Sequence, residues 1–296
     1  MIRILGTIFA GLLGLAFGSF LNVCLSRWPE GESVVVPRSH CRQCGRTLPW
    51  WENLPLVSWL VLGGRCRGCK SWIGWRYPLV ELAVGALWAL QVWRSSDHLF
   101  AGFSGFSPDF SFHFFDWIAP LGLMIFCWLL VALAALDAEH FWLPDFLTFP
   151  GIALGILYSV AMEAQIQSAI PSLGAMGRAA AVSLLSALAA ASLILVIRWG
   201  YWLMRRREGI GLGDAKLMAL LAAWLGLPGA LLAFGLGVVL GALAAVALLA
   251  FPAARKQSEN WAASRLPLGT FLCMGGIVSS LWGQPIIAAY LRWAGL

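Results

Sequence analysis

The chain has 296 residues, of which 60% are hydrophobic and only 11% are charged, and its mean hydropathy is +0.80. These values exceed those of soluble globular domains, so they predict an integral membrane protein. The net charge of +6 is explained by the bias of basic residues toward the cytoplasmic side of a membrane protein, and we expect no nucleic-acid partner.

The apolar segments predict an all-α, polytopic membrane protein with about eight transmembrane helices, since a helix needs about 20 apolar residues to cross a bilayer. The expected spans are residues 2–24, 78–94, 117–136, 146–162, 179–199, 216–227, 229–251 and 268–291. The sixth is short because Gly226, Pro228 and Gly229 follow it, and one continuous kinked span would change the topology. The first segment lacks a small-residue cleavage site, so we expect it to be retained.

The basic residues predict the orientation of these spans. Most of the 20 Lys and Arg residues fall on one face of the membrane, and the other face carries only Arg3, Arg94, Arg178 and Arg292. The basic face is expected to be cytoplasmic, which places both termini outside. The aromatic loop 95–116 is then external, and no chemistry is assigned to its His98 or His113.

Two C-x-x-C knuckles occupy the segment between the first two spans, residues 27–77, which we call the Cys-rich module. Its ligand candidates are Cys41, Cys44, Cys66 and Cys69, and Gly45 and Gly68 are expected to ease the turns. The spacing is typical of a tetrathiolate zinc site, and four Cys ligands leave no open position for catalysis. Two disulfides or four free thiols are the alternatives, but disulfides fit poorly with a cytoplasmic segment.

Two aspartates flank the turn between the third and fourth spans. Asp145 follows Pro144 and precedes an apolar segment, the ordinary pattern of a helix start. Asp137 instead ends an apolar run, where the helix dipole disfavours negative charge. An acid placed against the local electrostatics at membrane depth is a candidate functional residue.

A third aspartate, Asp214, opens the sixth span within the stretch GIGLGDAKL. It could simply cap the helix, but Gly211 and Gly213 also allow another chain to approach the carboxylate closely. The predicted topology places Asp137 and Asp214 on the same face of the membrane. Two carboxylates that share a proton and activate water indicate an aspartyl protease.

Several motifs together carry a family resemblance. They are GSFLNVCLSRWP at 18–29, the paired Cys knuckles, GWRYPLVE at 74–81, LDAEHFWLPD at 136–145, GIGLGDAKL at 209–217 and LPLGTFL at 266–272. In combination they resemble the type IV prepilin peptidases, which are bifunctional bacterial leader peptidases and N-methyltransferases.

The resemblance implies that Asp137 and Asp214 are the catalytic pair. It implies that a prepilin or pseudopilin precursor is cut at the cytoplasmic side of the inner membrane, after a Gly and before a Phe-like residue. S-adenosylmethionine would then methylate the new amino terminus. Whether the precursor serves a type IV pilus, competence or type II secretion is not resolved by the sequence.

The remaining site residues are assigned by region. Support of the catalytic loops is expected from Gly211, Gly213, Asp145 and Lys216, and methyl transfer or substrate binding from Gly18, Asn22, Gly64 and Glu81. The chain is accordingly divided into a first helix at 1–26, the Cys-rich module at 27–77 linked to methyl transfer and containing structural zinc, and a membrane protease domain at 78–296.

Two other classes of function stay open at this point. A transporter would need further ionisable residues along a path through the bilayer, and few are visible within the spans. A non-enzymatic scaffold with a zinc module for a pilus or secretion assembly would tolerate replacement of Asp137 and Asp214.

Overall fold

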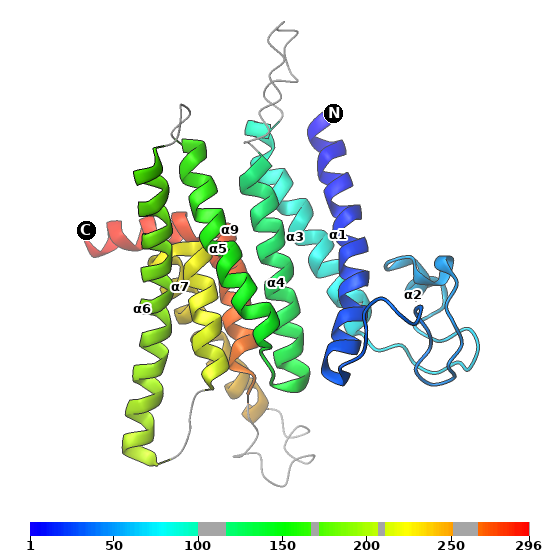
Figure 1. Cartoon of the computed structure of the whole chain (residues 1–296). Helices are drawn as coiled ribbons and strands as arrows, with labels where there is room; N and C mark the ends of the chain where they lie inside the picture. The colour runs from blue at the N-terminus through cyan, green and yellow to red at the C-terminus, as the bar shows by residue number, and fades with distance from the viewer. Residues whose placement is uncertain (100–116, 167–171, 207–210, 251–265, 296) are drawn as a thin grey trace, which may run out of the picture. The chain divides into compact units, whose positions relative to one another are not determined.

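The computed structural model describes residues 1–99, 117–166, 172–206, 211–250 and 266–295, and Figure 1 shows their helical architecture. The α-helices are α1 (Ile2–Arg27), α2 (Val57–Val61), α3 (Arg76–Leu99), α4 (Ile118–His140), α5 (Asp145–Ile166), α6 (Leu173–Arg205), α7 (Leu212–Ala250) and α9 (Leu268–Ala294). Two short 3-10 helices cover Trp28–Glu30 and Trp50–Asn53. No strand occurs in these ranges beyond two isolated bridges, so the all-α prediction is confirmed.

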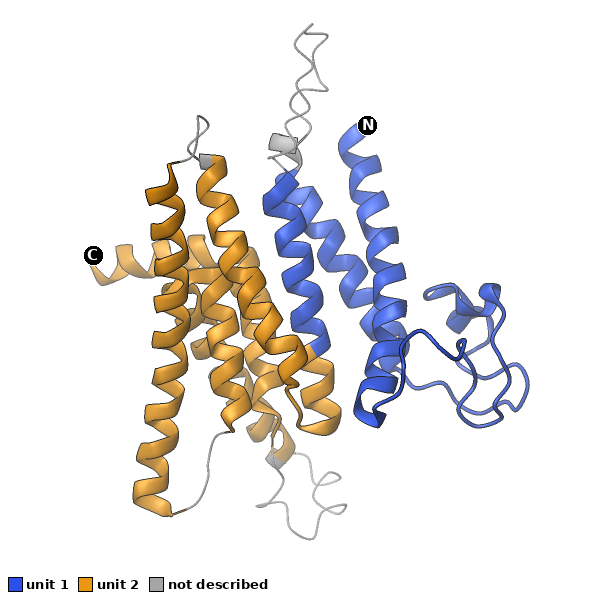
Figure 2. Ribbon diagram, in the orientation of Figure 1, with its two compact units in different colours: residues 1–132 blue, residues 133–296 orange. Residues whose placement is uncertain are grey.

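The chain divides into two compact units, Met1–Ala132 and Leu133–Leu296, whose boundary falls within α4 (Figure 2). Unit 1 contains α1, the Cys-rich module, α3 and the first part of α4, up to Ala132. Unit 2 contains the end of α4 and the helices that follow it. The external loop predicted at 95–116 lies outside the described residues from residue 100 onward, as does the basic segment 251–265.

The long helices make the protein a multi-pass membrane protein. Six of those described are long and apolar enough to cross a bilayer, and α3 is the predicted span that is not among them. The six are α1 with its 3-10 extension, α4, α5, α6, α7 and α9.

Helix α7 consists of two helical segments, because Gly226 has a left-handed φ of 69° and breaks the helix. After the break, Ser279 of α9 donates to the Gly229 carbonyl at 2.8 Å, and Gly237 lies against Leu272. The second segment of α7 is therefore antiparallel to α9. The sixth and seventh predicted spans are thus separate segments, although the first, 212–225, rises only about 20 Å, less than a bilayer core.

In unit 1, α1 and α3 approach closely because glycines leave room between them. A Cβ added to Gly18 would lie 2.7 Å from Glu81 Cα, and one added to Gly14 would lie 2.9 Å from Gly85 Cα. This contact brings Asn22 beside the start of α3, where its side-chain amide donates to the Tyr77 carbonyl at 2.9 Å.

Candidate active site

The two aspartates predicted to form a pair lie in the same part of unit 2. Asp137 ends α4 and Asp214 lies in the first turn of α7, and their side chains are buried, with exposed fractions of 6% and 8%. Their carboxylates are close enough to interact electrostatically. Cys273 of α9 is fully buried within electrostatic range of both.

Thr270, in the first turn of α9, positions the Asp137 carboxylate. Its backbone amide donates to Asp137 Oδ2 at 2.7 Å, and its hydroxyl lies 3.1 Å from the same oxygen. The hydroxyl also lies 3.1 Å from the Ala134 carbonyl, so its single proton is shared between these two acceptors. Asp137 is therefore fixed by α9 as well as by its own helix.

Glycines surround both carboxylates, as the sequence predicts for Gly211 and Gly213. The Gly211 amide donates to Asp214 Oδ2 at 3.1 Å, so Asp214 satisfies a backbone donor just before α7. A Cβ on Gly213 would lie 3.1 Å from Leu143 Cδ1, and one on Gly269 would lie 2.9 Å from Asp137 Cγ. Side chains at these positions would crowd the space around the pair.

Asp145 opens α5, as predicted, and its carboxylate forms an ion pair with Lys216 of α7. Lys216 also lies over the Phe149 ring, 5.5 Å from its centroid. The contact ties the start of α5 to the turn that contains Asp214. The support role expected for Asp145 and Lys216 stays a prediction, which this ion pair makes testable.

The four predicted metal ligands, Cys41, Cys44, Cys66 and Cys69, come together in unit 1, with all sulfur atoms within 4.8 Å of one another. Cys41 Sγ and Cys69 Sγ are 3.8 Å apart. Four zinc–sulfur bonds of about 2.3 Å in a tetrahedron place the sulfurs about 3.8 Å apart, so the cluster fits a zinc ion. The alternative of two disulfides does not occur, because all four cysteines are free.

The two knuckles have the same backbone hydrogen bonds. The Cys41 amide donates to the Arg46 carbonyl, the Cys66 amide donates to the Ser71 carbonyl, and both bonds are 2.9 Å long. Each turn needs one residue of left-handed φ, and these are Gly45 at 69° and Lys70 at 59°. The prediction that Gly68 eases the second turn is wrong, because the strained position lies two residues later, after the second Cys.

The surroundings of the cluster shift the pKa values of its thiols in different directions. The Ser71 hydroxyl and amide lower the pKa of Cys69. Burial raises the pKa of Cys41, but hydrogen bonds from the Cys44 amide and from its other neighbours outweigh burial and lower the value to about 6. The Arg46 amide lowers the pKa of Cys44, but burial and the neighbouring thiols raise it to about 11. A bound divalent metal would supply the positive charge needed for four thiolates.

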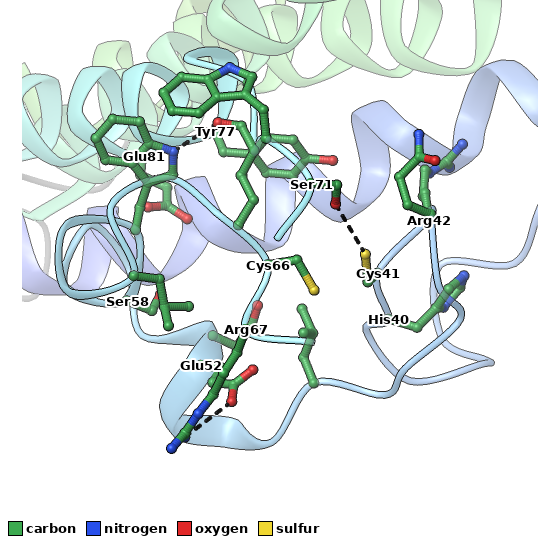
Figure 3. Close-up of a pocket in the computed structure, with 18 residues that line it drawn as sticks. His40, Cys41, Arg42, Glu52, Ser58, Cys66, Arg67, Ser71, Tyr77 and Glu81 are labelled. Carbon is green, nitrogen blue, oxygen red and sulfur yellow. Dashed lines mark hydrogen bonds and ion pairs between the residues drawn. The ribbon is translucent and has the colours of Figure 1, made fainter. Parts of the chain in front are cut away.

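The four residues predicted for methyl transfer or substrate binding gather around one region of unit 1. Asn22 and Glu81 line a cavity of about 110 Å³ between α1, α3 and the Cys-rich module. Glu81 also lines a second cavity of about 260 Å³ inside the module, drawn in Figure 3. Gly18 packs behind Glu81, and Gly64 packs against the rings of Trp59 and Trp72, which line the larger cavity.

Known proteins match the chain over almost its whole length. Residues 12–95 match the bacterial peptidase A24 N-terminal domain, and residues 124–246 match the type IV leader peptidase family. A prepilin leader peptidase/N-methyltransferase of Pseudomonas aeruginosa is 33% identical over 96% of this chain and 93% of its own length. Proteins with the same name from Burkholderia pseudomallei and Xanthomonas campestris are 35% and 33% identical, over 94% and 99% of this chain and 85% and 96% of their own lengths.

The chain belongs to the type IV leader peptidase family. No solved structure matches it. The N-terminal match contains the four cysteines, and the leader peptidase match contains Asp137 and Asp214.

Sequence reasoning did not single out Thr270 and Gly269, and it interprets Cys273 only as a packing residue in an apolar segment. All three lie on α9, within or just after the motif LPLGTFL, which contributed to the resemblance but received no role. A threonine beside a glycine at the start of an apolar helix carries no signal of its own. Its function becomes visible only through its contact with Asp137, 133 residues earlier.

Proposed function

We propose that the chain is a membrane aspartic endopeptidase that removes the leader peptide of type IV prepilin-like or pseudopilin precursors. The cut is made at the cytoplasmic side of the bacterial inner membrane, and the new amino terminus is then methylated. The observation that carries the proposal is the pair of buried aspartates, Asp137 and Asp214, brought together at the ends of two membrane helices.

Cleavage needs one ionised and one protonated carboxyl group, which two neighbouring buried acids provide because both cannot easily carry charge. Thr270 gives Asp137 two hydrogen-bond donors on one oxygen, which favours Asp137 as the ionised base. Asp137 takes a proton from water, whose oxygen attacks the scissile carbonyl carbon, and Asp214 protonates the carbonyl oxygen. The tetrahedral intermediate then collapses: Asp137 gives its proton to the leaving nitrogen, Asp214 takes back the proton of one hydroxyl group, and the carbon–nitrogen bond breaks.

The position of the pair suits a substrate whose hydrophilic leader precedes a membrane-embedded helix. The scissile bond of such a precursor lies near the bilayer interface, and both aspartates lie at helix ends rather than at helix centres. With the basic residues on the cytoplasmic face, this end of unit 2 faces the cytoplasm and both termini lie outside. Prepilin-like precursors and the lipid bilayer are therefore the partners, and nucleic acid is not.

Methyl transfer is assigned to unit 1, and S-adenosylmethionine is the donor. When bound, this donor would supply an electrophilic methyl group to the new terminal amine. Cys41, Cys44, Cys66 and Cys69 would hold a structural zinc ion that stabilises the module.

The test is intact-mass analysis of a purified prepilin precursor incubated with the full-length protein, with and without S-adenosylmethionine. The expected products are the mature chain without the donor and the same chain carrying one additional methyl group with it. An unchanged precursor mass, across precursors of pilus, competence and type II secretion systems, would overturn the peptidase proposal in favour of a non-enzymatic scaffold.

A further inference from the structure

Two of the cavities in unit 1 lie around Glu81 and share part of their walls. The larger, of about 260 Å³, lies within the Cys-rich module, and the smaller, of about 110 Å³, lies against α1. Six residues line both and stand where the two meet: His40, Arg42, Leu48, Asn53, Tyr77 and Glu81. The Arg42 guanidinium is paired with Glu30 and Glu32, so its charge is offset by carboxylates outside the junction. Figure 3 shows Glu81 and Tyr77 at the larger cavity, together with Cys41 and Cys66 of the two knuckles.

Glu81 brings a negative charge to this junction. Its side chain is buried, with an exposed fraction of 8%, and its Oε2 accepts the Leu56 amide at 2.7 Å. Within the described ranges no Lys, Arg or His side chain forms an ion pair with it. A buried carboxylate without a cationic partner is costly, and a positively charged ligand would remove that cost.

Asn22 adds an unsatisfied hydrogen-bond acceptor. Its exposed fraction is 2%, its side-chain amide nitrogen donates to the Tyr77 carbonyl, and its Oδ1 has no hydrogen-bond partner. The residue lines the smaller cavity. An orphaned acceptor of this kind calls for a donor such as an ammonium or hydroxyl group.

The wall of the larger cavity includes aromatic rings. Trp59 and Trp72 pack edge to face with their centroids 5.8 Å apart, and the Trp59 indole donates to the Ile73 carbonyl at 3.1 Å. Gly64 is required for this packing, since a Cβ there would lie 2.7 Å from the Trp72 ring. Aromatic faces attract cations and stack on planar bases.

We propose that these joined cavities bind S-adenosylmethionine, with Glu81 and the tryptophan wall facing its sulfonium group. Asn22 Oδ1 accepts a hydrogen bond from the ligand in the smaller cavity. The proposal rests on the methylation half of the proposed function. It explains why Gly18, Asn22, Gly64 and Glu81 converge in space, because two of them line the cavities and two pack directly behind the lining residues.

Loss of the methyl group turns the sulfonium into a neutral thioether, so a carboxylate and aromatic faces favour the donor over its product S-adenosylhomocysteine. Isothermal titration calorimetry on the purified full-length protein measures both ligands directly. We expect Glu81→Gln to weaken binding of S-adenosylmethionine by at least about tenfold and to change binding of S-adenosylhomocysteine by less than about threefold. The matched control Glu163→Gln, on α5 in unit 2, should bind both ligands like the unmodified protein.

Leader cleavage, which depends on unit 2, checks that each variant is folded. If Glu81→Gln fails this check, Trp72→Leu, at a half-exposed ring, is measured instead, with the same preferential loss of donor binding expected. Unchanged donor affinity in the folded variant would overturn this site while leaving both proposed activities intact. Absence of donor binding by the unmodified protein would overturn the site and the methylation together, and cleavage would still be judged by its own mass change.

Discussion

At the scale of single residues, the hydrogen bonds from Thr270 to Asp137 can be tested for their contribution to cleavage. Its hydroxyl and amide both lie within hydrogen-bond distance of Asp137 Oδ2, and a hydrogen bond to a charged group contributes about 1.5–3 kcal/mol. Thr270→Val keeps the amide bond and the side-chain volume but loses the hydroxyl. We expect leader cleavage to slow about tenfold or more in kcat, as measured by quantifying the mature product over time.

Thr270→Ser is the matched control because it keeps the hydroxyl, and it should restore most of the rate. Equal rates for Thr270→Val and the unmodified protein would show that the hydroxyl proton serves the Ala134 carbonyl and does not support catalysis.

Some residues of the candidate sites could be predicted from the sequence, and others could not. Asp137 was predictable because its position at a helix end contradicts the helix dipole, and the four cysteines because their spacing is typical of metal sites. Thr270 was not, since its role comes from a contact between distant helices. Lys70 was not either, because its left-handed backbone follows from the knuckle's hydrogen bonds and not from its side chain.

At the scale of elements, the close contact between α7 and α9 positions the active site. A Cβ on Gly275 would lie 2.2 Å from the Ala233 carbonyl oxygen, which is closer than any real contact. Gly275→Ala should therefore separate the two helices, lower stability by about 1–3 kcal/mol and displace Thr270 from Asp137. Thermal unfolding of the purified protein, followed together with leader cleavage, measures both effects.

Gly235→Ala is the control for that substitution, since Gly235 lies in α7 with nothing within 4 Å of an added Cβ. It should leave stability unchanged or raise it by about 0.5–1 kcal/mol. Equal loss in both variants would mean that the loss in Gly275→Ala does not come from the close contact between α7 and α9. The break at Gly226 could be predicted from the Gly and Pro residues around it. The packing of the second segment of α7 against α9 could not, because it is visible only in the three-dimensional contacts.

At the scale of the whole molecule, the two compact units predict that the two activities can be separated. The proposed zinc site would contribute on the order of 10 kcal/mol to the folding of a segment as small as the Cys-rich module. Treating the full-length protein with a strong chelator should remove one zinc ion per chain, measured by elemental mass spectrometry, and abolish methylation. Leader cleavage should fall by less than about threefold, because Asp137 and Asp214 belong to unit 2.

Re-addition of zinc should restore methylation. Simultaneous loss of cleavage and methylation on chelation would contradict this separation and would show that the metal supports both units. The division of the chain into a first helix, a Cys-rich module and a protease domain remains a prediction that this experiment addresses.

The central claim is that Asp137 and Asp214 form the catalytic pair, and the most direct measurement is the rate of leader cleavage by three single Asp→Asn variants. We expect Asp137→Asn and Asp214→Asn each to abolish cleavage of a prepilin precursor, because either change removes one of the two carboxyl groups. Asp145→Asn should keep measurable cleavage, since it removes only the ion pair with Lys216. Full cleavage by Asp137→Asn together with loss of cleavage in Asp145→Asn would contradict the account and assign the catalytic role to Asp145.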